Sequence, residues 1–358
     1  MFGFSVTQPL LRGYGSKVTR SGIYIARLSQ ESSIHDVENQ AVDLVFLVQQ
    51  AYWNFVYAHQ TLRVRELSVE QADTLLAYNR KGLELGTLTQ SDVLEAESML
   101  LSRHQDVLDQ KRIIRDAEDS LRRVINLTGE DDWRTGIVPL DEPSMRDIEV
   151  DTAGAMKKAL ALRPDYKIAR KQIEYDEFNR DLARNGLKPS LDLSARYNVH
   201  GSGTSYGKDV KDMGDFEQYG WNVGLVFSYP LRNRDAKAEV EKREIDIKRA
   251  DLALRELENS IMTDIRAAVR NVETLRESVD VAKKNVEVNE LKLRIEEERF
   301  RNQLSSSYYV LQFQKDLADS RNQYNKAVID YMMSINELQK SQGTVLQDMN
   351  ISIIGLKN

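Results

Sequence analysis

The residues of this chain that could do chemistry are few, and their spacing does not bring them together. There is no cysteine, which excludes disulfides, thiolate metal sites and cysteine nucleophiles. Paired carboxylates can act as general acid and base when they converge on a substrate. Here the pairs lie in an irregular connector at 131–132 and on a charged helix at 296–298, so we interpret them as solvated surface. The histidines lack metal-ligand spacing and are interpreted as surface or packing residues: His35, His59, His104 and His200.

Other catalytic patterns are missing from the sequence as well. It has no phosphate-binding glycine loop, nucleophile elbow or metal cluster. The three serines at 305–307 are typical of a capping turn. The sequence therefore predicts no catalytic residue, no cofactor, no metal and no enzymatic activity.

The composition favours long polar helices with narrow apolar stripes. Of 358 residues, 41% are hydrophobic and 30% are charged, and only six are proline. The 50 basic and 56 acidic residues are interspersed, which predicts no nucleic-acid partner. No run approaches the roughly 20 apolar residues of a membrane helix. No cleavable signal peptide precedes the strand-like pattern that begins the chain.

The helical part of the chain is built twice. When the sequence is shifted along itself by 217 positions, apolar residues coincide without a gap from Val48 on Ile265 to Leu121 on Leu338. Such self-similarity indicates two copies of one structural unit. The first helical run, from about Ser16 to Glu84, could span about 100 Å. This length is typical of a coiled coil or a barrel stave.

Turn signals divide each run into a helical hairpin. In the first turn, Gly86 can end the incoming helix, Thr89 or Ser91 can cap the outgoing one, and Asp92 is favourable in its first turn. The second hairpin is expected to start near position 235, to turn at 301–307 and to end at Gly343. Between the hairpins we expect an irregular connector at 130–152 and two short helices interrupted at 163–165.

Three short segments alternate between apolar and polar residues, as β-strands do. They lie at 2–11, 190–200 and 219–230, and each has one apolar face with aromatic residues. A half-buried sheet on a soluble core would show the same alternation. However, no further amphipathic layer is available to cover three strands. Strands of about 10 residues with apolar-out, polar-in alternation and aromatic ends favour a membrane β-barrel. One hairpin cannot close a barrel, so several chains would have to contribute.

Taken together, these features resemble the outer-membrane factor family, the TolC-like channels of tripartite efflux pumps and type I secretion systems. The resemblance covers residues 1 to about 346. It rests on the duplicated hairpin, on the turn Leu-Gly-Thr-Leu-Thr-Gln-Ser-Asp at 85–92, and on Ala-Leu-Arg-Pro-Asp at 161–165. The strand entry Lys-Pro-Ser-Leu-Asp-Leu at 188–193 and the hairpin end at 121–129 add to it.

The resemblance implies a fold that is mainly α with a small β part. Long helical hairpins would be staves of an α-barrel in the periplasm, and the strands would belong to a trimeric transmembrane β-barrel. The implied function is a passive exit duct in the bacterial outer membrane. Its implied partners are two further copies, a periplasmic adaptor, an inner-membrane pump or ABC transporter, and outer-membrane lipid. Family members have four strands per protomer. The three found here predict a fragment or a late start that lacks the signal sequence and first strand.

The resemblance also assigns residues to sites. The hairpin tips would form the periplasmic entrance and meet the adaptor. Where relatives place acidic rings, this chain has Tyr309 and Gln312, so a constriction of Tyr309 with Asp92 or Glu95 is the hypothesis. The barrel lumen would be lined by Asp192, Arg196 and His200. The adaptor-contact residues would be Leu85, Gly86, Thr87, Leu88 and Thr89 in the first tip, and Asn302, Gln303, Leu304, Ser305 and Ser306 in the second.

Two other readings explain part of the sequence. A soluble coiled-coil scaffold accounts for the hairpins but not for the strands between them. A periplasmic adaptor would have one hairpin inserted in β-rich domains. The predicted division is a barrel strand at 1–12, a helical hairpin at 13–129, an equatorial connector with short helices at 130–187, a barrel hairpin at 188–231, a second helical hairpin at 232–343 and a C-terminal tail at 344–358.

Overall fold

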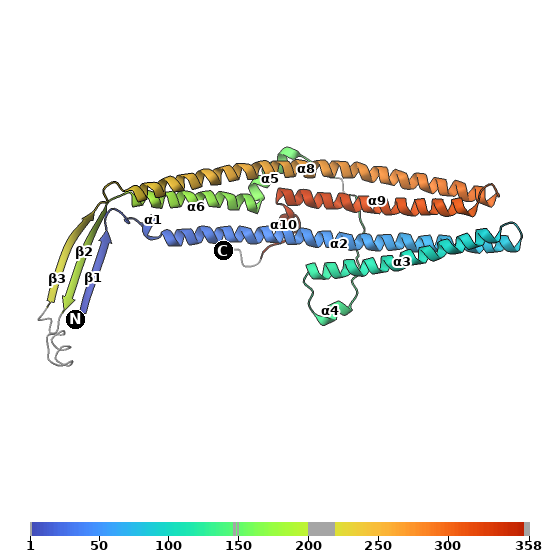
Figure 1. The fold of residues 1–358 in the computed structure, drawn as a ribbon, viewed down its shortest axis with the longest axis horizontal. Helices are drawn as coiled ribbons and strands as arrows, with labels where there is room; N and C mark the ends of the chain where they lie inside the picture. The colour runs from blue at the N-terminus through green and yellow to red at the C-terminus, as the bar shows by residue number, and fades with distance from the viewer. Residues whose placement is uncertain (1, 146–147, 149, 200–218, 354–358) are drawn as a thin grey trace, which may run out of the picture. The chain divides into compact units, whose positions relative to one another are not determined.

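A computed structural model describes residues 2–145, 148, 150–199 and 219–353 (Figure 1). The chain forms two compact units. Unit 1 contains Met1–Val37 and Pro164–Asn259, and unit 2 contains Glu38–Arg163 and Ser260–Asn358. The two longest helices, α2 (Ser21–Glu84) and α8 (Arg234–Arg301), contribute residues to both units. Within the described residues, no helix has the length and apolar character needed to cross a membrane.

The sheet of unit 1 has three antiparallel strands in the order β1-β2-β3. They are β1 (Phe2–Pro9), β2 (Ser190–Val199) and β3 (Tyr219–Ser228), so the three predicted strands are present with slightly earlier ends. The register places Val6 opposite Ala195 and Ala195 opposite Val223, which collects the apolar residues of all three strands on one face. That face is uncovered within the chain, because Phe4 is 70% and Trp221 is 72% exposed.

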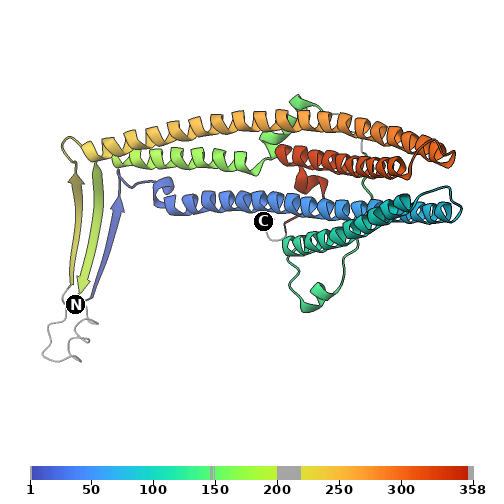
Figure 2. The same cartoon turned by 45° about the vertical axis from the view of Figure 1, so that its right-hand side comes forward.

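Within unit 1, the helices adjoin the sheet at one end of its strands (Figure 2). The helical run expected to start at Ser16 begins as α1 (Ser16–Thr19) and restarts as α2. The break lies at Arg20, whose φ of −103° and ψ of 14° leave the helical region. The 23-residue α6 (Pro164–Gly186) leads into β2, and Asn185 near its end accepts a hydrogen bond from the Gly13 amide at 2.8 Å.

Unit 2 holds the two helical hairpins. The outgoing helix of the first is α3 (Gln90–Val124), and that of the second is α9 (Ser307–Gln342). Both hairpins were predicted, and the second ends as expected at Gly343, a left-handed cap with φ 72°. The outgoing helix of the first ends at Val124, within the predicted hairpin end at 121–129, because Asn126 turns to φ 57°.

The two hairpin tips share an apolar core. Phe300 of α8 and Tyr78 of α2 lie with ring centroids 5.3 Å apart, and both hairpins supply members of one buried cluster. Its members are Leu75 of α2, Leu293 and Phe300 of α8, and Val310, Leu311 and Leu317 of α9, with Leu88, Met99, Val286 and Phe313 packed against them.

The connector is more ordered than predicted. The segment expected to be irregular contains α4 (Glu130–Arg134), and α5 (Thr152–Leu162) follows with Asp151 as its N-cap. Proline separates α5 from α6 as expected, because Pro164 cannot donate to the preceding ladder. A Cβ on Gly343 would come within 3.0 Å of the Arg163 backbone, so this glycine permits α5 to pack at the end of α9. The short α10 (Val345–Asp348) closes the described helices.

Candidate functional sites at the hairpin tips

The first tip is a five-residue turn closed by its own backbone. Gly86 adopts φ +70°, a left-handed conformation that costs glycine little. Its amide donates to Leu83 O at 3.0 Å, and the Thr87 amide donates to Gly82 O at 2.9 Å. These bonds satisfy carbonyls that the end of α2 would otherwise leave unpaired.

The Asp92 carboxylate stabilises the turn through hydrogen bonds. It accepts from the Thr89 amide at 2.8 Å and from the Thr89 hydroxyl at 2.6 Å, while the Asp92 amide donates back to Thr89 Oγ1 at 3.3 Å. This is a complete capping box at the start of α3. The Asp92 backbone carbonyl also accepts from the fully buried Asn79 side chain at 3.0 Å. Of the two capping candidates in the sequence, Thr89 is therefore the N-cap.

The second tip reproduces this backbone without glycine. Gln303 adopts φ +60°. Its amide donates to Phe300 O at 3.0 Å, and the Leu304 amide donates to Arg299 O at 2.8 Å. Ser306 is the N-cap of α9, but its side chain makes no capping bond. The residue at the third helical position is Tyr309, which has no carboxylate to complete a capping box.

A buried carboxylate fixes the second tip, and sequence reasoning missed it. Glu296 was interpreted as part of a solvated charged face, but it is only 4% exposed. It accepts a hydrogen bond from the Ser305 hydroxyl and forms an ion pair with Arg299 at 3.1 Å. The signal was the helical spacing, because Glu296 lies three residues after the buried Leu293 and four before the buried Phe300. Only this glutamate of the run faces the core.

The tip leucines have different surroundings. Leu85 and Leu304 are each 70% exposed. Leu88, which the sequence suggested as an exposed tip residue, is half-buried and packs against the shared cluster. Its side chain covers Gly82, where an added Cβ would lie 2.6 Å from Leu88 Cδ1. The packing of Leu88 thus accounts for its apolar character, whereas nothing in the turn accounts for Leu304.

The four predicted entrance residues remain separate. Tyr309 is 53% exposed and meets Tyr308 edge-on at 5.5 Å between ring centroids. Gln312 donates to Asp316 on its own helix at 3.1 Å, and Asp92 is engaged by Thr89. Glu95 is half-buried. Among the described residues, no hydrogen bond or ion pair joins Asp92 or Glu95 to Tyr309 or Gln312 in one chain. A constriction built from them would need side chains of more than one hairpin copy.

This geometry can be compared with known proteins. A sequence model of the outer membrane efflux protein family matches residues 1–127 and 155–344, which is most of the chain. The chain belongs to the outer membrane efflux protein family. The channel is 21% identical over 330 residues to the pyoverdine export outer membrane protein OpmQ of Pseudomonas putida, covering 90% of this chain and 67% of OpmQ. The family assignment decides against the scaffold and adaptor readings.

Solved outer membrane channels have the same fold. The Campylobacter jejuni channel CmeC matches with a TM-score of 0.77 at 17% identity, over 96% of this chain and 71% of CmeC. The open state of the Neisseria gonorrhoeae channel MtrE matches with a TM-score of 0.74 at 17% identity, over 96% of this chain and 80% of MtrE. The predicted combination of α-barrel staves with β-barrel strands is therefore confirmed. The protein is an outer-membrane efflux channel of a tripartite pump, and its family is one of transport proteins.

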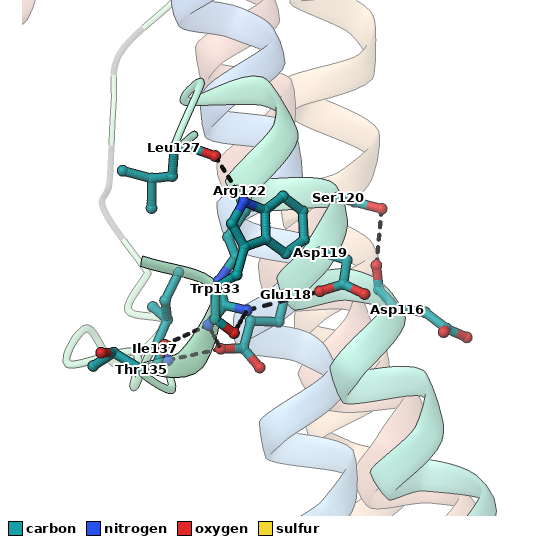
Figure 3. Close-up of polar contacts among 9 residues, drawn as sticks. All are labelled: Asp116, Glu118, Asp119, Ser120, Arg122, Leu127, Trp133, Thr135 and Ile137. Atoms are coloured by element: carbon teal, nitrogen blue, oxygen red, sulfur yellow. Dashed lines mark hydrogen bonds and ion pairs between the residues drawn. The ribbon is translucent and has the colours of Figure 1, made fainter. Parts of the chain in front are cut away.

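The connector of this efflux channel is clamped to the first hairpin by a buried arginine (Figure 3). Arg122 of α3 is 5% exposed, pairs with Glu118 at 2.6 Å and donates to the carbonyls of Trp133 and Thr135. Glu118 also accepts from the Ile137 amide at 2.7 Å. The clamp ties α4 and the segment after it to the last turn of α3. Nothing in the local sequence distinguishes Arg122 from its exposed neighbour Arg123.

The predicted lumen residues lie on the polar face of the sheet. Asp192 pairs in register with Pro9 and Val226, and Arg196 pairs with Ser5 and Asn222. Both therefore lie opposite to the face that carries Trp221 and Phe4. His200 is outside the described residues. The described part of the chain contains no group of three or more His, Cys, Asp or Glu residues that could hold a metal ion.

Proposed function

We propose that the two tips form the periplasmic entrance of this efflux channel and dock a periplasmic adaptor. The observation that carries the proposal is Leu304, an apolar side chain 70% exposed at the end of a rigidly hydrogen-bonded turn. Exposed apolar residues on a fixed surface favour a protein partner. Leu85 offers a second such side chain on the first tip. The adaptor would pass cargo from an inner-membrane pump or ABC transporter into the duct.

The turn residues of the proposed docking surface have two separate roles. Gly86, Thr87, Thr89 and Gln303 hold the backbone, whereas Leu85 and Leu304 present their side chains outward. Asn302, Ser305 and Ser306 complete the second tip and would contribute polar contacts at the rim. An apolar centre with a polar rim is the usual composition of a protein interface.

The same proposal places a constriction at the entrance. Family members are trimers, so three copies would bring Tyr309 near Asp92 or Glu95 of a neighbouring hairpin. Tyr309 is suited to this role because half of its surface is exposed one turn inside the tip. Gln312 lies one turn further along the same helix. Opening would be a small rotation of one hairpin against the other, stabilised by the bound adaptor. In the barrel, Asp192 and Arg196 would line a hydrated lumen at little energetic cost.

Site-specific photocrosslinking in living cells tests the docking surface. A photoreactive amino acid at position 304 or 85 should capture a periplasmic adaptor, identified by mass spectrometry, and Leu304→Gln should weaken both capture and drug efflux. Leu140 is the matched control because it is 90% exposed in the connector. Position 140 should give no adaptor adduct. Adducts from position 140 but not from 85 or 304 would contradict the proposal.

A further inference from the structure

A cavity of about 600 Å³ lies in unit 1, where the helices meet the sheet. Its lining residues come from α1, the first turns of α2 and the last turns of α6. In the ribbon, these helix ends lie next to the ends of β1 and β2 (Figure 2). Four cations, Lys17, Arg20, Arg184 and Lys188, line it together with one carboxylate, Asp181. Neither the tips nor the duct proposed above use these residues.

The cavity is positive because three of its four cations have no ion-pair partner among the described residues. Among the described residues, Lys17, Arg20 and Lys188 have no ion-pair partner, and all three are exposed. Arg184 pairs with Glu244 at 2.9 Å, while Asp181 is engaged by Arg180 at 2.9 Å. The segments 9–20, 181–189 and 229–237 carry eight Lys or Arg against two acids, Asp181 and Asp235, although the whole chain has a net charge of −6. Basic charge is thus concentrated at this junction.

One wall of the cavity is apolar. The rings of Tyr24 and Phe178 pack at a tilt of 39° with centroids 4.4 Å apart, and Val18 and Leu182 lie beside them. The Tyr24 hydroxyl donates to Glu174 at 2.7 Å, which holds the ring in place. A ligand of this cavity would therefore combine an anionic group with a hydrocarbon part.

The cavity also lies where the membrane would end. With ten residues each, β2 and β3 match the length of a tilted membrane-spanning strand. At the helix-side ends of the strands stand exposed apolar and aromatic residues: Tyr14 at 59%, Tyr229 at 50% and Leu231 at 90% exposure. Aromatic side chains at this level are typical of the interface between hydrocarbon and headgroups. The cations begin immediately beyond them.

We propose that this cavity binds the headgroup of an anionic glycerophospholipid from the inner leaflet of the outer membrane. The phosphate lies among Lys17, Arg20 and Lys188, and the first acyl carbons lie against Val18 and the Tyr24 ring. Basic pockets beside membrane-spanning segments recognise anionic lipid headgroups in this way. The proposal rests on the strands lying in the outer membrane and is independent of the adaptor.

A second cavity on α6 supplies the matched control. It has a volume of about 460 Å³ and is also lined by cations, Lys167, Arg170 and Lys171. There, however, Lys171 is held by Glu31 at 2.7 Å and Glu174 at 3.0 Å, and Glu177 adds further negative charge. This cavity is farther along α6 from the sheet. It should not select anionic lipid.

Native mass spectrometry of the purified trimer in neutral detergent tests the proposal. Dioctanoyl phosphatidylglycerol should bind at least tenfold more tightly than dioctanoyl phosphatidylcholine or inorganic phosphate. Arg20→Gln/Lys188→Gln should lose at least tenfold in affinity for phosphatidylglycerol, whereas the control Lys167→Gln/Arg170→Gln should bind like the wild type. If the first double variant does not assemble, Lys17→Gln replaces it, with an expected loss of about threefold.

Three results would overturn the proposal. Equal binding of phosphatidylcholine would show that charge is not recognised. Inorganic phosphate binding as tightly as phosphatidylglycerol would identify a free-anion site instead of a lipid site. Unchanged phosphatidylglycerol binding by the cavity variants would place the lipid elsewhere. Conductance and adaptor crosslinking are measured on the same variants and should be unchanged, so failure of the lipid site is distinguishable from failure of the duct.

Discussion

The two hairpin tips have the same backbone and different chemistry. They are related by the 217-position shift of the repeat, which places Gly86 on Gln303 and Thr89 on Ser306. Gly86 and Gln303 both adopt a left-handed conformation, and both turns make the same pair of backbone hydrogen bonds. The first tip adds a capping box, whereas the second adds a buried carboxylate. The turn geometry is thus common to the two repeats, and the side chains that stabilise it are not.

The buried polar position shows the difference most clearly. Asn79 and Glu296 are equivalent in the repeat and are 0% and 4% exposed. Asn79 donates to the backbone of the returning helix, while Glu296 accepts from the turn itself. The Asn79 amide makes one hydrogen bond, and its Oδ1 has none among the described residues, whereas a buried carboxylate needs charge and hydrogen bonds to offset its desolvation. Arg299 and Ser305 provide them.

Removing the buried Glu296 carboxylate should have the largest effect on stability. We expect Glu296→Ala to destabilise the second hairpin by about 2–3 kcal/mol, because a hydrogen-bonded charge is lost from the core. Asn79→Ala should cost about 1 kcal/mol, the value of a neutral hydrogen bond. Thermal unfolding of the purified protein in detergent measures both. The reverse order would show that the carboxylate does not stabilise the tip.

The Gly82→Ala substitution should have the second-largest effect on stability. Gly82→Ala places a methyl group within the Leu88 side chain, so Leu88 must leave its position over the helix. We expect a loss of about 1–2 kcal/mol from overpacking. Gly22→Ala is the control in the same helix, because a Cβ added there has no atom within 4 Å, and it should not destabilise the protein. Equal unfolding temperatures for wild type and Gly82→Ala would mean that Leu88 has no fixed place at the tip.

Substitutions at the two equivalent capping positions, 92 and 309, should change stability in opposite directions. Asp92→Ala removes the capping box and should cost about 1 kcal/mol. Tyr309→Asp offers Ser306 the partner it lacks and should stabilise the start of α9 by about 0.5 kcal/mol. Amide hydrogen exchange in the first turns of α3 and α9 reports each effect locally. Faster exchange at α9 in Tyr309→Asp would contradict the comparison.

Substitutions of the two left-handed residues, Gly86 and Gln303, should have smaller and opposite effects on stability. Gln303→Gly relieves a conformation that disfavours residues with a Cβ, and we expect a gain of about 0.5 kcal/mol after the entropic cost of glycine. Gly86→Gln should lose about 1 kcal/mol for the converse reason. Unfolding temperatures of the two variants test the pair. If both substitutions were destabilising, side-chain contacts of Gln303 would have to hold the second turn.

The smallest effect concerns pH and the first hairpin. His59 packs against Phe55 with ring centroids 4.6 Å apart, and burial, followed by the charge of Arg63, lowers its pKa from 6.5. The unfolded chain therefore binds a proton more readily than the folded chain. The contribution of His59 to the free energy of unfolding should be fully present above about pH 6.5 and should be lost as pH falls through the folded pKa. His59→Gln should flatten this part of the pH profile, whereas an unchanged slope would assign it to other groups.

Much of this architecture could be predicted from the sequence, because period and repeat are local signals. Alternation gave the three strands, and the turn at Gly86 and Thr89 gave the first tip. The inward placement of Glu296 was missed because three consecutive glutamates hide which one faces the core. Leu88 was misplaced because its neighbour across the turn, Gly82, leaves a space that only the structure reveals. The clamp at Arg122 depends on carbonyls of a segment folded back from α4, and this return has no local pattern.

Single-channel recording of the purified outer-membrane protein in planar bilayers tests the central claim most directly. The wild type should show discrete conductance steps. Tyr309→Ala, together with Asp92→Ala or Glu95→Ala, should raise the conductance or the open fraction, whereas Leu140→Gln should leave the currents unchanged. Conductance that is identical in all of these variants would remove the tips from the entrance. A protein that inserts but carries no current would contradict the duct itself.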